Sequence, residues 1–445
     1  MHNFKQFFKG EKITLMGLGL LGRGVGDAVF LAECGAKLTI TDLKTKEQLK
    51  ESLKKLKKFK NIKYVLGKHQ LEDFRNCDIV LKAAGVPLDS IYIKEARKNK
   101  IPVEMSATIF AKLSGLPMVG VTGTRGKSTV THLIAHILKS AGKKVILGGN
   151  IRGVSNLQLL KKAKNAKIAV FELDSWQLQG FGESKISPNI SIFTNFLSDH
   201  MNYYTNDRER YFDDKSNIFK FQKKKDILVL GPQMKGKIKN AKSKIINTNI
   251  KNIPKSWHPS LFGKHNQENI ICAVEAARVL KVKESVIKKS VENFQTISGR
   301  LELVKEIKGI KIYNDNSSTT PDATIAALRA VGDKKKRKVV LIIGGDKKFL
   351  DMLGLLREIP QFCSKVVLFK EKGTKLIRDK VFEFKKKGIN VYEEEGLLNT
   401  VQRAFKVAKP SETILYSPAF SSFGKYFENE YDRGEKFMKI VKSLR

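Results

Sequence analysis

Short runs of aliphatic and β-branched residues alternate along the chain with stretches whose apolar positions recur at helical spacing. In the first quarter, the runs at 12–16, 38–41, 79–82 and 101–104 are typical of strands, and those at 25–34 and 93–98 of helices. Strands separated by helices in this way form parallel sheets. The pattern therefore predicts a small doubly wound α/β domain that ends near residue 109.

The same alternation continues to the end of the chain. Further candidate strands lie at 119–121, 144–147, 167–171, 190–194, 310–313, 339–343 and 413–416. Candidate helices lie at 127–138, 210–219, 270–277 and 322–330. A polar tract at 235–255 interrupts the alternation, and Ser298-Gly299-Arg300 marks a second boundary. We therefore expect an α/β protein with three domains, spanning residues 1–109, 110–297 and 298–445.

The strand at 119–121 runs into a glycine-rich turn that opens a helix, and this stretch carries the strongest chemical signal. Gly123 and Gly126 allow backbone N–H groups to converge on an anion at the positive end of the helix. Lys127 can reach phosphate groups, and the hydroxyl of Ser128 or Thr129 can bind Mg²⁺. The stretch is shorter than the full P-loop consensus, so a glycine-rich surface turn stays the alternative.

A second glycine-rich turn follows the first strand of the chain. Gly17, Gly19 and Gly22 have the Gly-x-Gly-x-x-Gly spacing, and the next strand ends at Asp42. This arrangement is typical of sites for a pyrophosphate or ribose-bearing ligand. One such motif does not identify the ligand.

Polar residues stand where several candidate strands end, namely Asn150, Glu172, Asp199 and His200. Ligands in open α/β sheets bind outside these strand ends, so the set favours a metal site beside the phosphate loop. Taken alone, a Glu or His at such a position is more often a surface or capping residue. Asn266 and Asn269 share one helix face and are suited to holding a nucleobase or phosphate. Lys215, by itself, reads as a surface lysine.

The composition and charge limit the classes of partner that the protein is expected to bind. The 445 residues include 84 Lys and Arg against 44 Asp and Glu, a net charge of +40. The excess is spread along the chain without interleaved stacking aromatics, which favours a solvated lysine-rich surface over a nucleic-acid module. No apolar run reaches the ~20 residues of a membrane span, and the start lacks a signal-peptide pattern. With four dispersed cysteines, we expect a cytoplasmic monomer with free thiols and no membrane partner.

Taken in order, these blocks resemble the Mur ligases of peptidoglycan precursor synthesis. The resemblance is carried by Thr122-Gly-Thr-Arg-Gly-Lys-Ser-Thr129, Gly149-Asn150, Glu172-Leu-Asp-Ser-Trp-Gln-Leu178, Asp199-His-Met201, Gly263-Lys-His-Asn266 and Gly299-Arg300. It implies a Rossmann-like domain for a uridine diphosphate substrate, a central P-loop ATPase-type domain and a C-terminal Rossmann-like domain for an amino acid. Arg300-Leu-Glu-Leu-Val, Gly-Gly-Asp-x-Lys348 and Ser417-Pro-Ala-x-x-Ser422 look like the members that add D-glutamate to UDP-N-acetylmuramoyl-L-alanine.

The resemblance also implies roles for individual residues. ATP would be bound by Gly123, Thr124, Arg125, Gly126, Lys127, Ser128, Thr129, Asn266, Asn269, Arg300 and Asp315. Two Mg²⁺ ions would be held by Ser128, Thr129, Glu172, His200 and Lys215, the last as a carbamate. Catalysis would fall to Lys127, Asn150, His200 and Lys215.

The substrates would meet residues of the outer domains. The uridine diphosphate substrate would contact Gly19, Leu20, Leu21, Asp42 and Gly85, and D-glutamate would contact Thr319, Lys348, Ser422, Phe427 and Tyr431. Ser317 stands where many D-glutamate ligases have Lys, Arg125 where the loop usually has Asn, and Ala83-Ala84-Gly85 replaces Ser-Pro-Gly. The stretch 423–434 is one residue longer than the family pattern. A Mur ligase or folylpolyglutamate synthase using another amino acid therefore stays open, as do a nucleic-acid-binding NTPase and an inactive UDP-sugar-binding protein.

Overall fold

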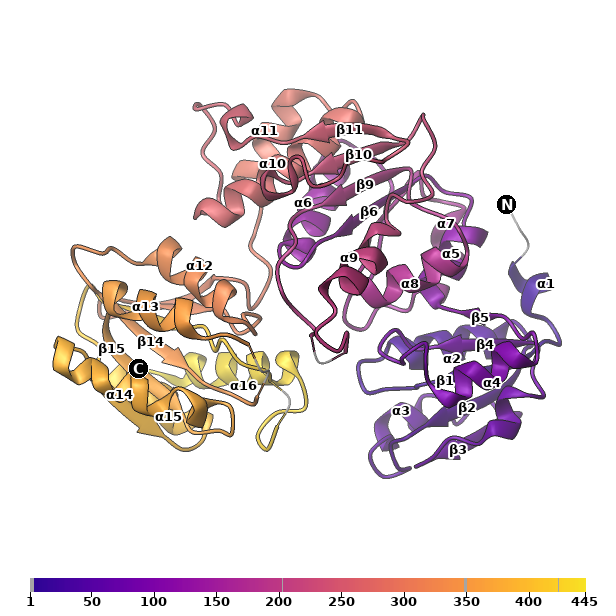
Figure 1. The fold of residues 1–445 in the computed structure, drawn as a ribbon, viewed down its shortest axis with the longest axis horizontal. Coiled ribbons are helices and arrows are strands. Elements are labelled where there is room, and N and C mark those ends of the chain that lie inside the picture. The colour runs from indigo at the N-terminus through magenta and orange to yellow at the C-terminus, as the bar shows by residue number, and fades with distance from the viewer. Residues whose placement is uncertain (1–3, 202, 348–349, 423) are drawn as a thin grey trace. The chain divides into compact units, whose positions relative to one another are not determined.

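The computed structural model describes residues 4–201, 203–347, 350–422 and 424–445. These residues form three sheets with helices packed against them (Figure 1). They group into two compact units. The first unit runs to Leu197 and adds Asn206–Lys255 and Asn269–Val291, and the second comprises Ser198–Thr205, Ser256–Glu268 and Glu292–Arg445.

The first sheet has five parallel strands. Their spatial order is β3 (Ile62–Leu66), β2 (Lys37–Asp42), β1 (Lys12–Met16), β4 (Ile79–Lys82) and β5 (Val103–Glu104). The accompanying helices are α1 (Phe4–Phe8), α2 (Arg23–Glu33), α3 (Lys50–Lys54), η1 (Leu71–Phe74) and α4 (Ile91–Lys98). The chain order reverses between β1 and β4, which is where open α/β sheets bind their ligands.

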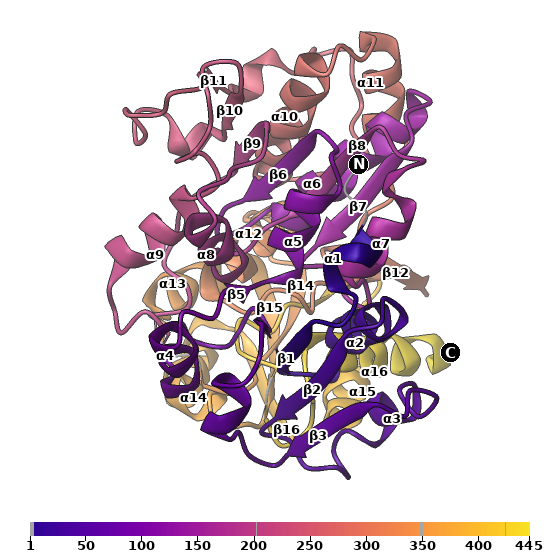
Figure 2. The ribbon, with the colours of Figure 1, turned by 90° about the vertical axis from the view of Figure 1, so that its right-hand side faces the viewer.

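The second sheet has six parallel strands in the same unit. Their order is β11 (Lys244–Asn247), β10 (Ile227–Leu230), β9 (Ile190–Phe193), β6 (Met118–Thr122), β8 (Ile168–Glu172) and β7 (Val145–Gly149). The helices are α5 (Ser106–Leu113), α6 (Lys127–Ser140), α7 (Asn156–Ala163), α8 (Ser175–Glu183), α9 (Arg208–Ser216), η2 (Pro232–Met234), η3 (Ile250–Asn252), α10 (Lys264–Val279) and α11 (Glu284–Glu292). Figure 2 shows α6 lying along β6, the strand at the reversal of order.

One apolar core joins the first two sheets. Helix α5 packs on α7 and α8, and the ring of Phe110 stacks on that of Phe171 in β8 with centroids 4.7 Å apart. Helix α2, which accompanies the first sheet, also packs on α7. The two sheets therefore belong to a single compact unit rather than to two separate ones.

The third sheet forms the second unit. Its order is β12 (Glu302–Ile307), β13 (Ile310–Asn314), β17 (Thr413–Tyr416), β14 (Val339–Ile343), β15 (Cys363–Phe369) and β16 (Asn390–Glu394), with β12 antiparallel and the others parallel. The helices are α12 (Pro321–Val331), α13 (Leu353–Phe362), η4 (Thr374–Leu376), α14 (Arg378–Phe382), η5 (Glu383–Lys387), α15 (Leu397–Val407) and α16 (Glu430–Ser443). The loops after β13, β17 and β14 are neighbours, because these three strands are adjacent.

The predicted α/β alternation is confirmed, with β1, β4, β14 and β17 beginning and ending at the expected residues. The polar tract at 235–255 was expected to interrupt the alternation of strands and helices, but it contains the edge strand β11. That strand's Lys244 and Asn247 are exposed and its isoleucines only half-buried, so its pattern lacks the apolar run of a central strand.

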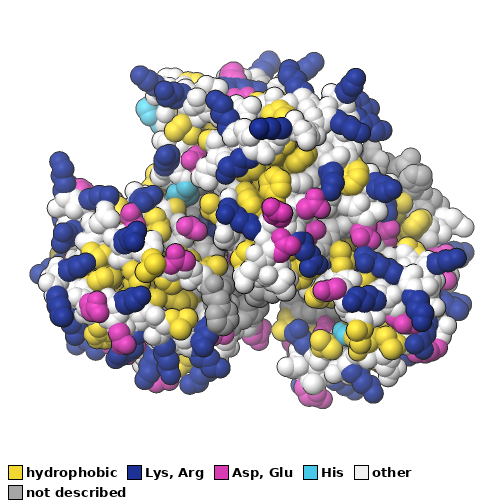
Figure 3. Space-filling model, viewed as in Figure 1, with side chains coloured by type: hydrophobic (Ala, Val, Ile, Leu, Met, Phe, Trp, Pro, Cys, Tyr) yellow, Lys and Arg dark blue, Asp and Glu magenta, His cyan; other side chains and the backbone are white. Residues whose placement is uncertain are grey.

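The surface agrees with the dispersed charge of the sequence. On the face shown in Figure 3, Lys and Arg side chains are scattered, with Asp and Glu between them. Across the part of the chain that the structure describes, no helix has the length and apolarity needed to span a bilayer.

Candidate active site

The phosphate loop lies between the end of β6 and the start of α6. Gly126, the residue before α6, has φ 82°, and Gly123 has φ 139°, both in the region that favours glycine. A Cβ on Gly123 would overlap Thr194 Oγ1, and one on Gly126 would overlap Asn269 Oδ1. The two glycines of the motif are therefore required both by backbone conformation and by space.

The end of β9 holds this loop in place. Asn195 accepts the N–H of Thr124 with its carbonyl oxygen at 3.0 Å and the N–H of Arg125 with its side-chain oxygen at 2.9 Å. The Thr194 hydroxyl donates to the Arg125 carbonyl at 2.6 Å. Asn195 was not predicted to be a site residue. Its position just after a strand was the available signal.

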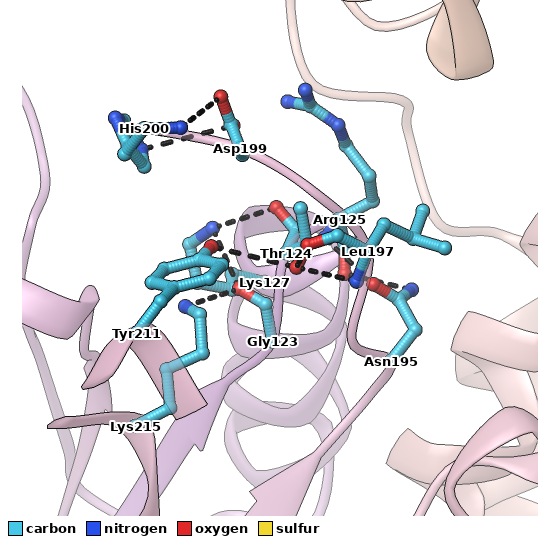
Figure 4. Close-up of polar contacts among 10 residues, drawn as sticks. All are labelled: Gly123, Thr124, Arg125, Lys127, Asn195, Leu197, Asp199, His200, Tyr211 and Lys215. Atoms are coloured by element: carbon cyan, nitrogen blue, oxygen red, sulfur yellow. Dashed lines mark hydrogen bonds and ion pairs between the residues drawn. The ribbon is translucent and has the colours of Figure 1, made fainter. Parts of the chain in front are cut away.

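Two lysines donate to the same carbonyl oxygen in this loop (Figure 4). Lys127 Nζ lies 3.1 Å from Gly123 O and 3.0 Å from Thr124 O, and Lys215 Nζ lies 2.9 Å from Gly123 O. Lys215 is 1% exposed and projects from α9, 4.9 Å from the ring centroid of Tyr211. The reading of Lys215 as a surface lysine was wrong, because the packing of α9 buries it beneath the phosphate loop.

Glu172 ends β8, immediately beside the loop after β7. Its carbonyl accepts the N–H of Asn150 at 2.8 Å, and a Cβ on Gly149 would overlap that carbonyl. Ser128 and the buried Thr129 lie in the first turn of α6, following the neighbouring strand β6. A carboxylate and hydroxyls are hard oxygen ligands, which suit Mg²⁺.

Asp199 and His200 follow β9 and group with the second unit. The Asp199 carboxylate accepts the backbone N–H of His200 at 2.9 Å and lies 3.7 Å from its ring Nε2. His200 has φ 56°, an uncommon conformation for a residue with a Cβ. Among the residues that the structure describes, no three His, Cys, Asp or Glu side chains form a metal-binding group. The expected ligand set, with two hydroxyls and a modified lysine, does not require such a group.

The glycine-rich turn after β1 is closed by Asp42. The Asp42 carboxylate accepts the N–H of Gly19 at 3.0 Å and that of Lys44 at 2.9 Å. Gly85 lies in the loop after β4, and Leu20 is 42% exposed. The buried Lys82 donates to the carbonyl of Val86 at 2.8 Å, and its burial lowers its pKa to about 7. Lys82 therefore orders the loop that carries Gly85, a role the sequence did not indicate.

This turn is also tied to the loop after β7. Leu21 accepts the N–H of Gly153 at 3.1 Å, and Arg23 donates to the side-chain oxygen of Asn150. Behind them, the buried Asp27 accepts the hydroxyl of Ser155 at 2.5 Å. Hydrogen bonds thus link the glycine-rich turn, the candidate site for the nucleotide sugar, to the loop that carries the candidate catalytic residue Asn150.

The remaining ATP candidates lie on α10 and in the loops beside β12 and β13. Asn266 and Asn269 are both buried in α10, and Asn266 donates to the carbonyl of Phe262 at 2.9 Å. Arg300 lies just before β12. The Asp315 carboxylate accepts the hydroxyls of Ser318 at 2.5 Å and Ser417 at 2.8 Å, and burial raises its pKa to about 6.

Two of the amino-acid candidates, Thr319 and Ser422, lie in the loops after β13 and β17. Thr319 is half-buried and Ser422 is buried. Phe427 packs in the core 5.6 Å from the Phe369 ring, whereas Tyr431 is half-exposed at the start of α16. Lys348 lies outside the described residues.

The comparisons with known proteins decide the family. The Mur ligase middle domain matches residues 121–259, and the Mur ligase glutamate ligase domain matches residues 299–420. A UDP-N-acetylmuramoylalanine–D-glutamate ligase of Borreliella burgdorferi is 35% identical, over 98% of each chain. The chain belongs to the Mur ligase family.

Solved Mur ligases share this fold. A UDP-N-acetylmuramate-alanine ligase from Thermotoga maritima has a TM-score of 0.64 at 19% identity, covering 98% of this chain and 100% of its own. A MurF ligase from the same organism, in complex with ADP, has a TM-score of 0.58 at 16% identity, covering 99% and 97%. The α/β fold with parallel sheets and a mixed C-terminal sheet is thereby confirmed as that of the three-domain Mur ligases.

Proposed function

We propose that this Mur ligase uses ATP to join D-glutamate to UDP-N-acetylmuramoyl-L-alanine, in peptidoglycan precursor synthesis. The observation that carries the proposal is the pair of lysines on one carbonyl of a strand–loop–helix phosphate site. The match to a D-glutamate ligase over nearly the full length supports the choice of substrates. We assign residues 1–109 to the nucleotide-sugar substrate, 110–297 to ATP and 298–445 to the amino acid.

The reaction needs activation because a carboxylate does not condense with an amine directly. The L-alanyl carboxylate attacks the γ-phosphate of ATP, releases ADP and becomes an acyl phosphate. The amine of D-glutamate then attacks the acyl carbon, and phosphate leaves as the amide forms. In this scheme Lys127 stabilises the charge of the transferred phosphoryl group, and Asn150 orients the acceptor near it.

Mg²⁺ supplies charge neutralisation between the anionic reactants. The family resemblance assigns its ligands to Ser128, Thr129, Glu172, His200 and Lys215, the last as a carbamate. Burial and a neighbouring cation both disfavour a charged ammonium, and the neutral amine is the form that combines with CO₂. The burial of Lys215 beside Lys127 supports this assignment.

The other proposed contacts follow the ends of neighbouring strands. Gly19, Leu20, Leu21, Asp42 and Gly85 are assigned to the nucleotide sugar, and Thr319, Lys348, Ser422 and Tyr431 to D-glutamate. We retain Phe427 as a second aromatic candidate, although its packing against Phe369 supports Tyr431 instead.

The deciding experiment measures phosphate release from ATP with UDP-N-acetylmuramoyl-L-alanine and a panel of amino acids. We expect turnover with D-glutamate and none with L-lysine, diaminopimelate or L-glutamate. Turnover with L-lysine or diaminopimelate would assign the chain to another Mur ligase activity. ATP hydrolysis stimulated by polynucleotide, with a steep dependence on salt, would instead support a nucleic-acid-binding NTPase.

A further inference from the structure

Arg433 is a completely buried arginine at the point where three loops meet. It projects from α16 and is 0% exposed. Its Nη1 donates to the carbonyls of Phe420 at 3.2 Å and Ser421 at 3.3 Å, and its Nη2 donates to the carbonyl of Asn316 at 2.7 Å. The same Nη1 lies 3.5 Å from the position that a Cβ on Gly345 would occupy. The guanidinium therefore contacts or borders the loops after β17, β13 and β14.

Two of these loops, those after β13 and β17, carry described residues of the proposed amino-acid site. Ser422 follows the two carbonyls bound by Nη1, and Thr319 follows Asn316 along the chain. Backbone hydrogen bonds also join the loops, from Ala419 N–H to Ser318 O at 2.9 Å and from Asp346 N–H to Ser421 O at 3.1 Å. Ligands of open α/β sheets bind at such strand ends. A change in Arg433 would therefore act directly on the loops after β17 and β13.

Among the described residues, Arg433 donates no hydrogen bond to a carboxylate, although the negative charge of Glu430 attracts it. Its hydrogen-bond acceptors among the described residues are all backbone carbonyls, and its Nε has no partner there. Tyr416 is buried, which raises its pKa to about 12 and keeps it neutral. Glu430, in the first turn of α16, is half-exposed. Burying an arginine in this way is costly, and an arginine stays protonated in proteins.

We propose that Arg433 is a positioning residue of the amino-acid site, where it fixes the loops carrying Thr319 and Ser422 and adds a positive potential that selects an amino acid with a second carboxylate. The proposal rests on the proposed function, since it concerns the same site. The positive potential acts in a poorly hydrated environment, where it is weakly screened.

Two substitutions separate the charge from the hydrogen bonds. Arg433→Gln retains N–H donors for the carbonyls but removes the positive charge. Arg433→Lys retains the charge but loses the planar guanidinium group and its fixed arrangement of donors. The measurement is kcat/KM for D-glutamate and for D-glutamine, with KM for ATP and for UDP-N-acetylmuramoyl-L-alanine. For Arg433→Gln we expect a ten- to hundredfold rise in KM for D-glutamate, an equal loss of preference over D-glutamine, and little change in the other KM values.

For Arg433→Lys we expect a preference for D-glutamate within about threefold of the wild type, even if turnover falls. If Arg433→Gln does not fold, the Arg433→Lys variant still tests the proposal. Lys365→Gln is the matched control, because Lys365 is a buried cation of the same sheet that is paired with Glu412 at 2.6 Å. It should lower the unfolding temperature and leave the preference unchanged.

Three results would overturn the proposal. The first is an unchanged preference in Arg433→Gln, and the second is a preference lost in Arg433→Lys. The third is a wild-type enzyme whose amino-acid substrate has no second anionic group, which would remove the role of Arg433 while leaving the ligase activity intact. If the wild type prefers another dianionic amino acid, the proposed substrate fails and the comparison is made with that amino acid and its amide.

Discussion

Lys127 and Lys215 donate to the same oxygen, the carbonyl of Gly123, at 3.1 and 2.9 Å. Lys127 is the first residue of α6 and Lys215 the second-last residue of α9, so the two lysines are neighbours neither along the chain nor within one helix. Two ammonium groups on one acceptor repel each other, and the repulsion is reduced when one becomes neutral or when an anion binds between them. The pair therefore links the phosphate loop to the proposed lysine modification.

The first prediction concerns Lys127. Lys127→Ala should lower kcat by on the order of 10²–10⁴-fold, because it removes a preorganised charge that stabilises phosphoryl transfer. Phosphate release measures the effect, and circular dichroism checks that the variant is folded. Lys139→Ala, an exposed lysine in the last turn of the same helix, serves as the control and should retain full activity. Near-normal turnover in folded Lys127→Ala would contradict the mechanism.

The second prediction concerns Lys215. Lys215→Ala should abolish most activity, and acetate should partly restore it by supplying the missing carboxylate. Lys215→Arg should stay inactive with acetate, since arginine keeps a positive charge in the place of a negative ligand. Lys220→Ala, in which an exposed lysine paired with Asp213 is removed, should behave like the wild type. Mass spectrometry or a carbon-13 signal from labelled bicarbonate tests the carbamate directly, and full activity of Lys215→Ala would exclude it.

The third prediction concerns the space at Gly126. Gly126→Ala should destroy ATP binding, because a Cβ there overlaps Asn269 Oδ1 and the φ of 82° disfavours any side chain. Gly142 has a similar φ of 73° but open space around its Cβ position. Gly142→Ala should cost only the backbone strain, about 1 kcal/mol of unfolding free energy. Nucleotide titration and thermal unfolding of both variants measure the difference, and equal effects would show that strain alone matters.

The fourth prediction concerns pH and the buried Asp27. Burial raises its pKa to about 6, above the unfolded value of 3.8, so the folded state binds this proton more tightly. Between about pH 4 and pH 6 this group makes the protein more stable as the pH falls, by at most on the order of 3 kcal/mol. Asp27→Asn should remove that part of the pH dependence in denaturant unfolding. Asp89→Asn, at an exposed position, is the control and should leave the slope as in the wild type. A slope unchanged in Asp27→Asn would refute the assignment.

The sequence alone determined the α/β alternation, the glycine-rich phosphate loop and the family resemblance. Each depends on residues close together in the chain: a buried β-branched run such as Val339–Ile343 forms a strand locally, and Gly123 and Gly126 impose local backbone geometry. The edge strand β11 was missed because its half-exposed isoleucines give a weak pattern.

Only the tertiary structure decided which distant side chains share a site. It buried Lys215 against Gly123, placed Asn195 on the phosphate loop, joined Arg23 to Asn150 and set Arg433 beneath three loops. Lys215, Arg23 and Arg433 carry no local signal, since nothing in the sequence distinguishes a buried lysine or arginine from the exposed ones in a chain with 84 Lys and Arg residues. Burial arises from sheet order and helix packing, which bring strand ends and helix faces together across long stretches of chain.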